Sequence, residues 1–170
     1  MFEDKRHVIS TPKTISEKIL DVLSFLLLLG MFLYVILIWG DLPDKVPAHF
    51  NGLGEPDRWG GKGTVLALPI VAAFLFKLLF IVKKFPQVFN YPVEITEENA
   101  KDMYQISRKM LSTLTFFLTF FFAIGVWETV QVAHGQAGLG IWFLPGLLVS
   151  MFGTIGYYMY RMFKVRKPQK

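Results

Sequence analysis

The sequence predicts an all-α fold: a four-helix transmembrane bundle with an ordered extracellular loop between helices 1 and 2 and a cytoplasmic interfacial helix before helix 3. Three observations predict it. Apolar residues make up 53% of the 170-residue chain and charged residues only 18%, whereas about 25% of the residues of a soluble domain are charged. The apolar residues fall in four long runs. Most lysines and arginines fall in every second segment between those runs.

Each apolar run is long enough to cross a bilayer, whose hydrocarbon core of about 30 Å requires roughly 20 residues of helix. In chain order the runs are residues 22–39, 64–82, 111–132 and 139–163. A soluble chain of this length would have too little polar sequence to cover four such helices. Pro69 and Pro145 are expected to kink or loosen the second and fourth helices.

The distribution of lysine and arginine predicts the orientation. These residues are frequent before the first run, between the second and third runs and after the fourth, but three of them occupy the first connection and none the last. We therefore predict a multi-pass protein of the bacterial cell membrane with both termini in the cytoplasm. Tryptophans near the predicted outer ends, where indoles favour the headgroup zone, agree with this orientation: Trp39, Trp59, Trp127 and Trp142.

The composition also excludes some classes of function. No cysteine is present, which rules out disulfides, thiolate nucleophiles and cysteine-ligated metal centres. The net charge of +5 does not predict nucleic-acid binding, because the cations stand at the ends of apolar runs and not in one patch. We expect no cofactor, no resident metal and no nucleic-acid partner.

The chain divides into five predicted segments. In order they are a cytoplasmic N-terminal tail at 1–14, a two-span domain at 15–85 with an outer loop at 41–63, a cytoplasmic loop and interfacial helix at 86–110, a two-span C-terminal hairpin at 111–163, and a basic cytoplasmic tail at 164–170. Thr14 and Glu17 have the spacing of a capping box, so the first helix is expected to begin near Ile15.

The interfacial helix is predicted from a polar start and a helical period. Thr96 is followed by two glutamates, which is typical of an N-cap whose acidic first turn meets the helix dipole. The cations that follow, Lys101, Arg108 and Lys109, are expected to lie near anionic lipid headgroups. The alternative role for this helix is to bind a partner.

The outer loop at 41–63 is longer than a simple connection between two spans requires. Prolines restrict its backbone, and Asn51-Gly52, Gly54 and Gly60-Gly61 suit tight turns with positive φ. Apolar and polar side chains are interspersed along it. We therefore expect a small folded cap on the extracellular side.

This loop carries a recognisable motif, LPDKVPAHFNGLGEPDRWGGK at residues 42–62. It resembles the signature of the bacterial SdpI-like immunity proteins, in the N-terminal membrane domain of unknown function that carries the LPxxVPxHFNxxGxPDxWGxK loop. The resemblance covers roughly residues 20–85, and residues 90–100 resemble a subset of the same proteins. It implies a domain with an outward-facing motif. The chain departs from the immunity protein, which has more than the four spans predicted here.

Seven residues are the candidates for contact with an external ligand: His49, Asn51, Glu55, Asp57, Arg58, Trp59 and Glu128. The alternative role for His49 is structural, in which its imidazole pins the turn. A functional set would join His49 to Glu55 and Asp57, with Glu128 and His134 from the other outer loop, as a divalent-metal site or a proton-linked switch. The alternative for Asp57, Arg58 and Lys62 is a salt-bridged turn at the headgroup level.

Apart from Arg161 in the last turn of the fourth run, two charged residues stand inside the apolar runs. Lys77 is one and a half turns from the end of the second run, where its long side chain can reach the interface. Glu128 is near the outer end of the third run and is expected to face the bundle or water. The alternative for Glu128 is simple exposure to the headgroups.

Three classes of function follow, in order of preference. The first is an immunity-like or sensor-like protein that binds an extracellular peptide, toxin or lipid headgroup through the outer loop. The second is an oligomeric small transporter or an accessory subunit of a membrane complex. An intramembrane enzyme ranks third, because no run carries a recognisable nucleophile, a metal motif or a paired acid and base, and we predict no catalytic activity. The expected partner is the lipid bilayer; an extracellular peptide and a second copy of the chain are the candidates for others.

Overall fold

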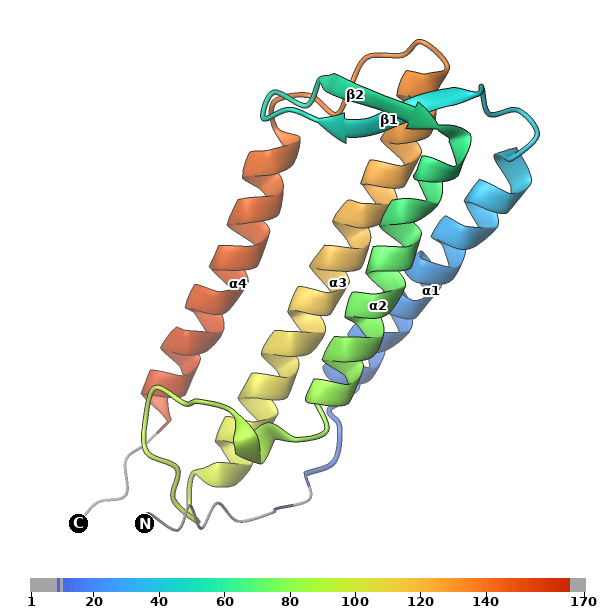
Figure 1. Ribbon diagram of the computed structural model, residues 1–170. Helices are drawn as coiled ribbons and strands as arrows, with labels where there is room; N and C mark the ends of the chain where they lie inside the picture. The colour runs from blue at the N-terminus through green and yellow to red at the C-terminus, as the bar shows by residue number, and fades with distance from the viewer. Residues whose placement is uncertain (1–8, 10, 166–170) are drawn as a thin grey trace, which may run out of the picture.

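The computed structural model describes residue 9 and residues 11–165. Four long helices lie side by side (Figure 1): α1 Ile15–Ile38, α2 Ala67–Val82, α3 Ala100–Ala133 and α4 Phe143–Lys164. Most of the predicted tails at 1–14 and 164–170 lies outside the described residues.

Three helical segments of the described chain are long and apolar enough to cross a membrane, namely Ile15–Ile38, Lys62–Val82 and Ala100–Ala133. These segments fit an integral membrane protein. Helix α4 forms as expected but is not among them, because its glycines and tyrosines lower its mean hydropathy. A fourth span therefore stays a prediction.

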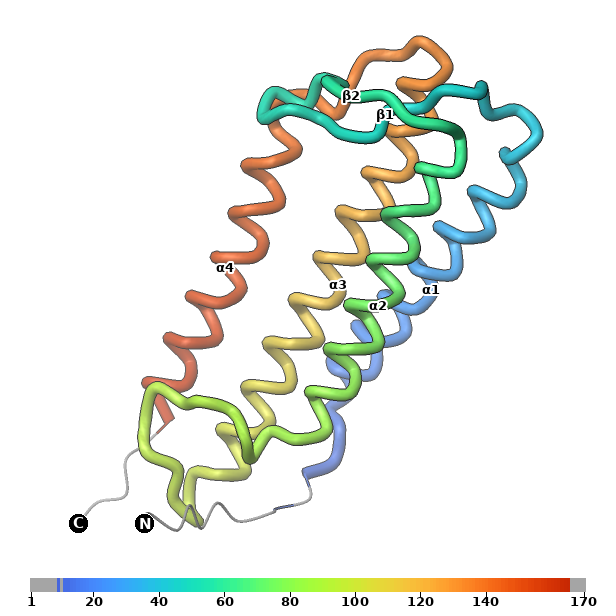
Figure 2. The backbone as a smooth tube through the Cα atoms, in the orientation of Figure 1, coloured from blue at the N-terminus to red at the C-terminus, as the bar shows by residue number. Residues whose placement is uncertain are grey.

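Helix α3 is the centre of the bundle. It contacts α1, α2 and α4, whereas α4 packs mainly against α3. The backbone tube in Figure 2 shows α4 standing apart from α1 and α2. One face of α3 between α2 and α4 is consequently left without a neighbouring long helix.

The outer loop is a β-hairpin, which the all-α prediction did not include. Strand β1, Lys45–Phe50, pairs antiparallel with β2, Pro56–Gly61, and the 3₁₀ helix η1, Lys62–Leu66, leads into α2. Pro47 lies within β1, where it is tolerated because both strands of a two-stranded sheet are edges. Figure 1 shows the hairpin lying across the ends of the helices and reaching toward α4. We call this side of the molecule the hairpin end.

The prediction that the glycines of this loop occupy turns with positive φ is largely wrong. Of Gly52, Gly54, Gly60 and Gly61, only Gly54 has a positive φ, of 80°. Gly60 and Gly61 belong to β2, where the backbone is extended. The sequence pattern does not distinguish a glycine in a strand from one in a turn, because glycine tolerates both conformations.

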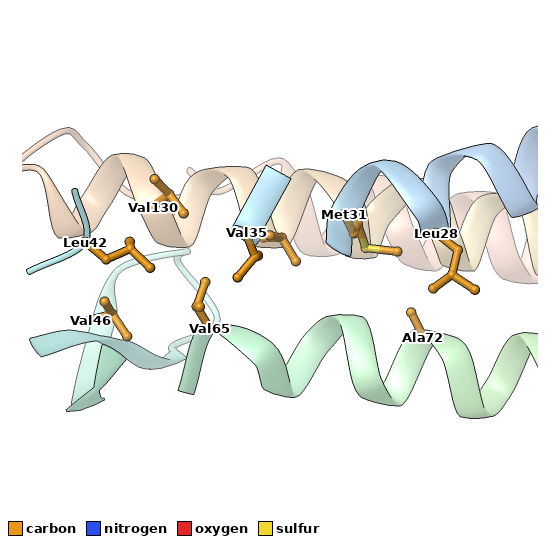
Figure 3. Packing of buried hydrophobic residues seen from close by; sticks show 9 residues of the cluster. Leu28, Met31, Val35, Leu42, Val46, Val65, Ala72 and Val130 are labelled. Carbon is orange, nitrogen blue, oxygen red and sulfur yellow. The ribbon is translucent and has the colours of Figure 1, made fainter. Parts of the chain in front are cut away.

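An apolar cluster fixes the hairpin to the helices. Val46 of β1 and Val65 of η1 are fully or almost fully buried, together with Val35 of α1. Figure 3 shows side chains of this cluster pointing into the space between α1 and α2. The base of the hairpin is therefore part of the hydrophobic core.

The predicted interfacial helix is not a separate element. Its residues form the first turns of α3, which runs unbroken for 34 residues, or roughly 50 Å at about 1.5 Å per residue. This exceeds the thickness of a bilayer's hydrocarbon core, about 30 Å, so α3 is longer than a span requires. The helix begins after Asn99, whose side chain accepts from the backbone N–H of Thr96 at 2.9 Å. Thr96 thus stabilises a preceding turn and is not the N-cap.

Pro69 and Pro145 do not interrupt their helices. Each is the third residue of its helix, α2 or α4. A backbone N–H in the first turn has no partner within the helix, so proline costs little there. Both prolines therefore mark helix starts and not kinks.

The opposite side of the molecule, which we call the tail end, comprises residues 9 and 11–14, the α2–α3 connection and the end of α4 (Figure 1). Here the capping box is present as predicted: Glu17 accepts from the backbone N–H of Thr14 at 2.7 Å. The other oxygen of Glu17 accepts from Arg108 Nε at 3.0 Å. Arg108 also donates to the backbone carbonyls of Thr11 and Pro12.

Arg108 is therefore buried, not placed at the headgroups as the sequence predicted. The Glu17 side chain is 2% exposed and that of Arg108 10%. A second ion pair joins Asp21 of α1 to Lys83, just after α2, and Ser112 of α3 also donates to Asp21. These contacts connect α1, α2 and α3 at the tail end.

We predict that Arg108→Ala lowers the free energy of unfolding by about 3–5 kcal/mol, because it leaves the Glu17 carboxylate buried and unpaired. The double variant Glu17→Gln, Arg108→Gln should lose less, since no buried charge remains. Unfolding of the purified chain in detergent measures both. Lys101→Ala, at an exposed position on the same helix, is the control and should leave stability unchanged. Equal stability of Arg108→Ala and this control would contradict the prediction.

Candidate ligand-binding site at the hairpin end

His49 stands near the end of β1, opposite Arg58 of β2. The strand register is irregular on both sides of His49, and such bulges re-aim side chains. His49 Nδ1 lies 2.6 Å from Asp57 Oδ1, with the two side chains 54% and 44% exposed. If Nδ1 donates to the carboxylate, Nε2 is left to meet a ligand, since it has no hydrogen bond within the described part of the chain.

Asn51 closes the hairpin turn. Its side-chain oxygen accepts from the backbone N–H groups of Leu53 at 2.9 Å and Glu55 at 3.0 Å. Its side-chain amide donates to the Glu55 carboxylate at 3.1 Å. Asn51 and Glu55 are thus brought together, and their polar groups hold the loop in shape.

A cavity of about 270 Å³ lies beneath the hairpin, near the lower limit for a small-molecule pocket. Its walls come from β1, η1, α2, α3, α4 and the connection before α4. His49, Thr64 and Thr129 are its polar side chains, and Thr129 already donates to the Gly125 carbonyl at 2.7 Å. Aromatic rings make up much of the remainder: Phe50, Phe121, Phe122 and Phe143.

The hairpin tip packs on the connection between α3 and α4. Gly54 packs so tightly on the α3–α4 connection that a Cβ added to it would lie 2.6 Å from the backbone nitrogen of Gly140. A Cβ added to Gly138 would collide with the Gly54 carbonyl. The two outer loops are therefore in backbone contact, which only residues without side chains allow.

The other candidate residues take different positions. Arg58 and Trp59 are exposed on β2, and Trp59 pairs with Pro47. Glu128 makes no side-chain hydrogen bond or ion pair with any residue that the structure describes, and it is absent from the cavity lining. The structure thus brings His49 to Asp57 and Asn51 to Glu55, but it does not bring Glu128 to either pair.

His134 and Lys62 make contacts elsewhere at the hairpin end. The ring nitrogens of His134 lie 2.8 Å from the Val130 carbonyl and 3.1 Å from the Asp41 carbonyl, so this residue connects the end of α3 to the chain after α1. Lys62 Nζ lies 5.4 Å from the centre of a Trp39 ring. Among the described residues, no group of three His, Asp or Glu side chains could hold a metal ion.

The cavity is not predictable from the sequence pattern. Its wall on α3 is formed by Phe121, Phe122, Gly125 and Thr129, whose spacing is that of one helix face. The spacing was visible in the third run, but a helix in lipid can be apolar on every side. Only the position of the hairpin above this face distinguishes it from the others.

One comparison with known proteins matches a segment that includes the hairpin. Residues 26–73 match the domain of unknown function DUF1648. The matched segment contains both strands and most of α1. The cavity walls on α3 and α4 lie outside it. The more specific resemblance to SdpI-like immunity proteins stays a prediction.

An uncharacterized protein of the archaeon Archaeoglobus fulgidus is 33% identical over 90 residues, which cover 48% of this chain and 49% of the archaeal protein. The chain thus spans about half the length of the curated relative that it matches. No solved structure matches this chain.

We predict that Gly54→Ala destabilises the hairpin end by at least about 1–2 kcal/mol, the approximate cost of left-handed backbone for a residue with a Cβ. The clash with Gly140 adds to that cost. Gly52→Ala is the matched control, because Gly52 has open space around it and no positive φ. Thermal unfolding of the two variants measures the difference. Equal melting temperatures would show that the two outer loops are not held together at Gly54.

Proposed function

We propose that this integral membrane protein binds an amphipathic external ligand at the hairpin end. The observation that carries the proposal is the apolar cavity with His49 in its lining. The apolar part of the ligand occupies the cavity, and its polar part meets His49 and Asp57 at the exposed edge of the hairpin. A hydrophobic peptide or a lipid has both an apolar part and a polar part of this kind.

A protective role is one form of this proposal. A protein that sequesters a membrane-active peptide at the outer surface would give immunity to it, and the resemblance of residues 42–62 to SdpI-like proteins supports that role. We propose binding without catalysis, since the cavity walls are almost wholly apolar. The predicted alternative, an oligomeric transporter, ranks second because Lys77 and Glu128 are the main ionisable candidates that the apolar runs offer for lining a pathway.

The proposed topology has four spans, with the hairpin end outside and the tail end in the cytoplasm. It is supported by the lysines and arginines at the tail end of the helices, where α1 and α3 begin and α2 and α4 end (Figure 1). Lys77 is exposed on α2, and in this topology its side chain extends toward the inner headgroups.

Cysteine labelling tests the topology, because the native chain has no thiol. We expect a membrane-impermeant maleimide to label Gly52→Cys in intact cells, since Gly52 is exposed in the hairpin turn. Lys101→Cys, exposed at the start of α3, should be labelled only after lysis. The reverse pattern would invert the topology and place the site in the cytoplasm.

Filling the cavity tests the binding site. Gly125 lies in its wall, and a Cβ added there comes 3.1 Å from Leu68. We expect Gly125→Leu to weaken binding of a fluorescent undecanoic-acid probe by about tenfold, which corresponds to about 1.4 kcal/mol. Fluorescence titration of the purified chain in neutral detergent measures the affinity.

Gly153→Leu is the matched control, because Gly153 lies on α4 with open space around it and outside the cavity lining. It should bind the probe as the parent does. His49→Phe, which keeps a ring but removes its hydrogen bonds, separates the polar contribution from the apolar one. Equal affinity of Gly125→Leu and the parent would show that the cavity is not the binding site.

A further inference from the structure

Three lysines converge on one aromatic ring at the tail end. The Nζ atoms of Lys13, Lys83 and Lys84 lie 4.9, 5.7 and 5.3 Å from the centre of the Phe80 ring. Phe80 is in the last turn of α2, and two of the lysines directly follow that helix. We call these three residues the lysine cluster.

The described residues supply one carboxylate to the lysine cluster. Asp21 accepts from Lys13 Nζ at 2.8 Å and also from Lys83. Lys84 is exposed and makes no ion pair with any residue in the described part of the chain. The nearby carboxylate of Glu17 is paired with Arg108. The cluster therefore retains excess positive charge.

A cavity of about 490 Å³ opens beside the cluster. Lys13, Lys83, Lys84 and Arg108 all contribute to its lining. Like charges held this close repel one another, and they do so more strongly where water is partly excluded. An anion in the cavity would relieve that repulsion, and a phosphate oxygen accepts hydrogen bonds from several ammonium groups at once.

An apolar path leads away from the cluster. The ring of Phe80 stacks on that of Phe76 with 6.3 Å between centroids, and Phe76 in turn lies 6.3 Å from Phe25 of α1. Phe80 and Phe25 are 37% and 52% exposed. The row of three rings thus extends from the charged cavity along α1 and α2, which are both apolar enough to lie in a membrane.

We propose that the lysine cluster binds the phosphate of an anionic lipid, whose acyl chain lies along Phe80, Phe76 and Phe25. Basic pockets between membrane helices hold lipid headgroups in this way. This site is at the opposite end of the molecule from the proposed ligand site. A negative result at one site therefore leaves the proposal for the other unaffected. A free phosphate has the same anionic group as the lipid headgroup, but it has no acyl chain to contact the three aromatic rings.

Native mass spectrometry of the full-length chain in neutral detergent tests the proposal. The chain is incubated with equal amounts of phosphatidylglycerol and phosphatidylcholine of different masses. We expect the parent to retain phosphatidylglycerol preferentially and Lys84→Gln to retain about fivefold less of it, the factor expected for one lysine at an anionic surface. Lys84→Arg, which keeps the charge, should behave as the parent.

Lys101→Gln is the matched control, because it removes one exposed charge at the tail end without touching the cluster. It should retain lipid as the parent does. Lys13→Gln provides a second removal from the cluster at a side chain that is 42% exposed, and melting temperatures report whether each variant is folded. Equal loss in Lys84→Gln and Lys101→Gln, or equal retention of both lipids by the parent, would overturn the proposal.

Inorganic phosphate distinguishes the two sources of the anion. We expect it to leave the melting temperature of the parent unchanged at concentrations where phosphatidylglycerol raises it. The contrary result is that phosphate raises the melting temperature of the parent but not of Lys84→Gln, while neither lipid is retained. That result would show that the lysine cluster binds free phosphate and not a lipid.

Discussion

The packing of three helices on α3 is the constraint on which the rest of the structure depends. Because α1, α2 and α4 all contact α3, its faces decide which surfaces are buried and which remain open. α1 and α2 hold to it through an apolar cluster toward the hairpin end. At the tail end the Glu17–Arg108 ion pair joins α1 to α3. Ser112 of α3 donates to Asp21 of α1 and accepts from Lys83, just after α2. α4 lies apart from α1 and α2 (Figure 2). The cavity beneath the hairpin has walls from α2, α3 and α4.

The two ends of the bundle differ in what they bury: apolar side chains at the hairpin end and also charged side chains at the tail end. At the hairpin end the sheet covers an apolar space and is fixed by buried valines at its base and by glycine contacts at its tip. At the tail end, the carboxylates of Glu17 and Asp21 are largely withdrawn from water, and each of them has at least one cation as a partner. Unpaired charge in such surroundings is costly, whereas an apolar cavity has no such requirement. This difference is the physical basis for proposing an apolar ligand at one end and an anion at the other.

Features that depend on neighbours in the chain were predictable. The capping box of Thr14 and Glu17 is set by a spacing of three residues, and the ordered turn at Asn51 is set by its own side chain. The strands were missed because Pro47 and the paired glycines weaken the strand signal. Arg108 was assigned to the headgroups because nothing near it in sequence indicates a buried partner; Glu17 is 91 residues away.

The sequence by itself determined that the chain is built from long apolar helices, where the first of them begins, and that the loop at 41–63 is ordered. Each of these follows from hydropathy, helix length or hydrogen bonds between near neighbours. The tertiary structure alone decided that His49 is among the residues lining a cavity with walls on α3 and α4, and that Lys13 joins Lys83 and Lys84 around Phe80. Such contacts join distant segments, so they depend on the direction in which each helix leaves its connection and on which face it turns to α3.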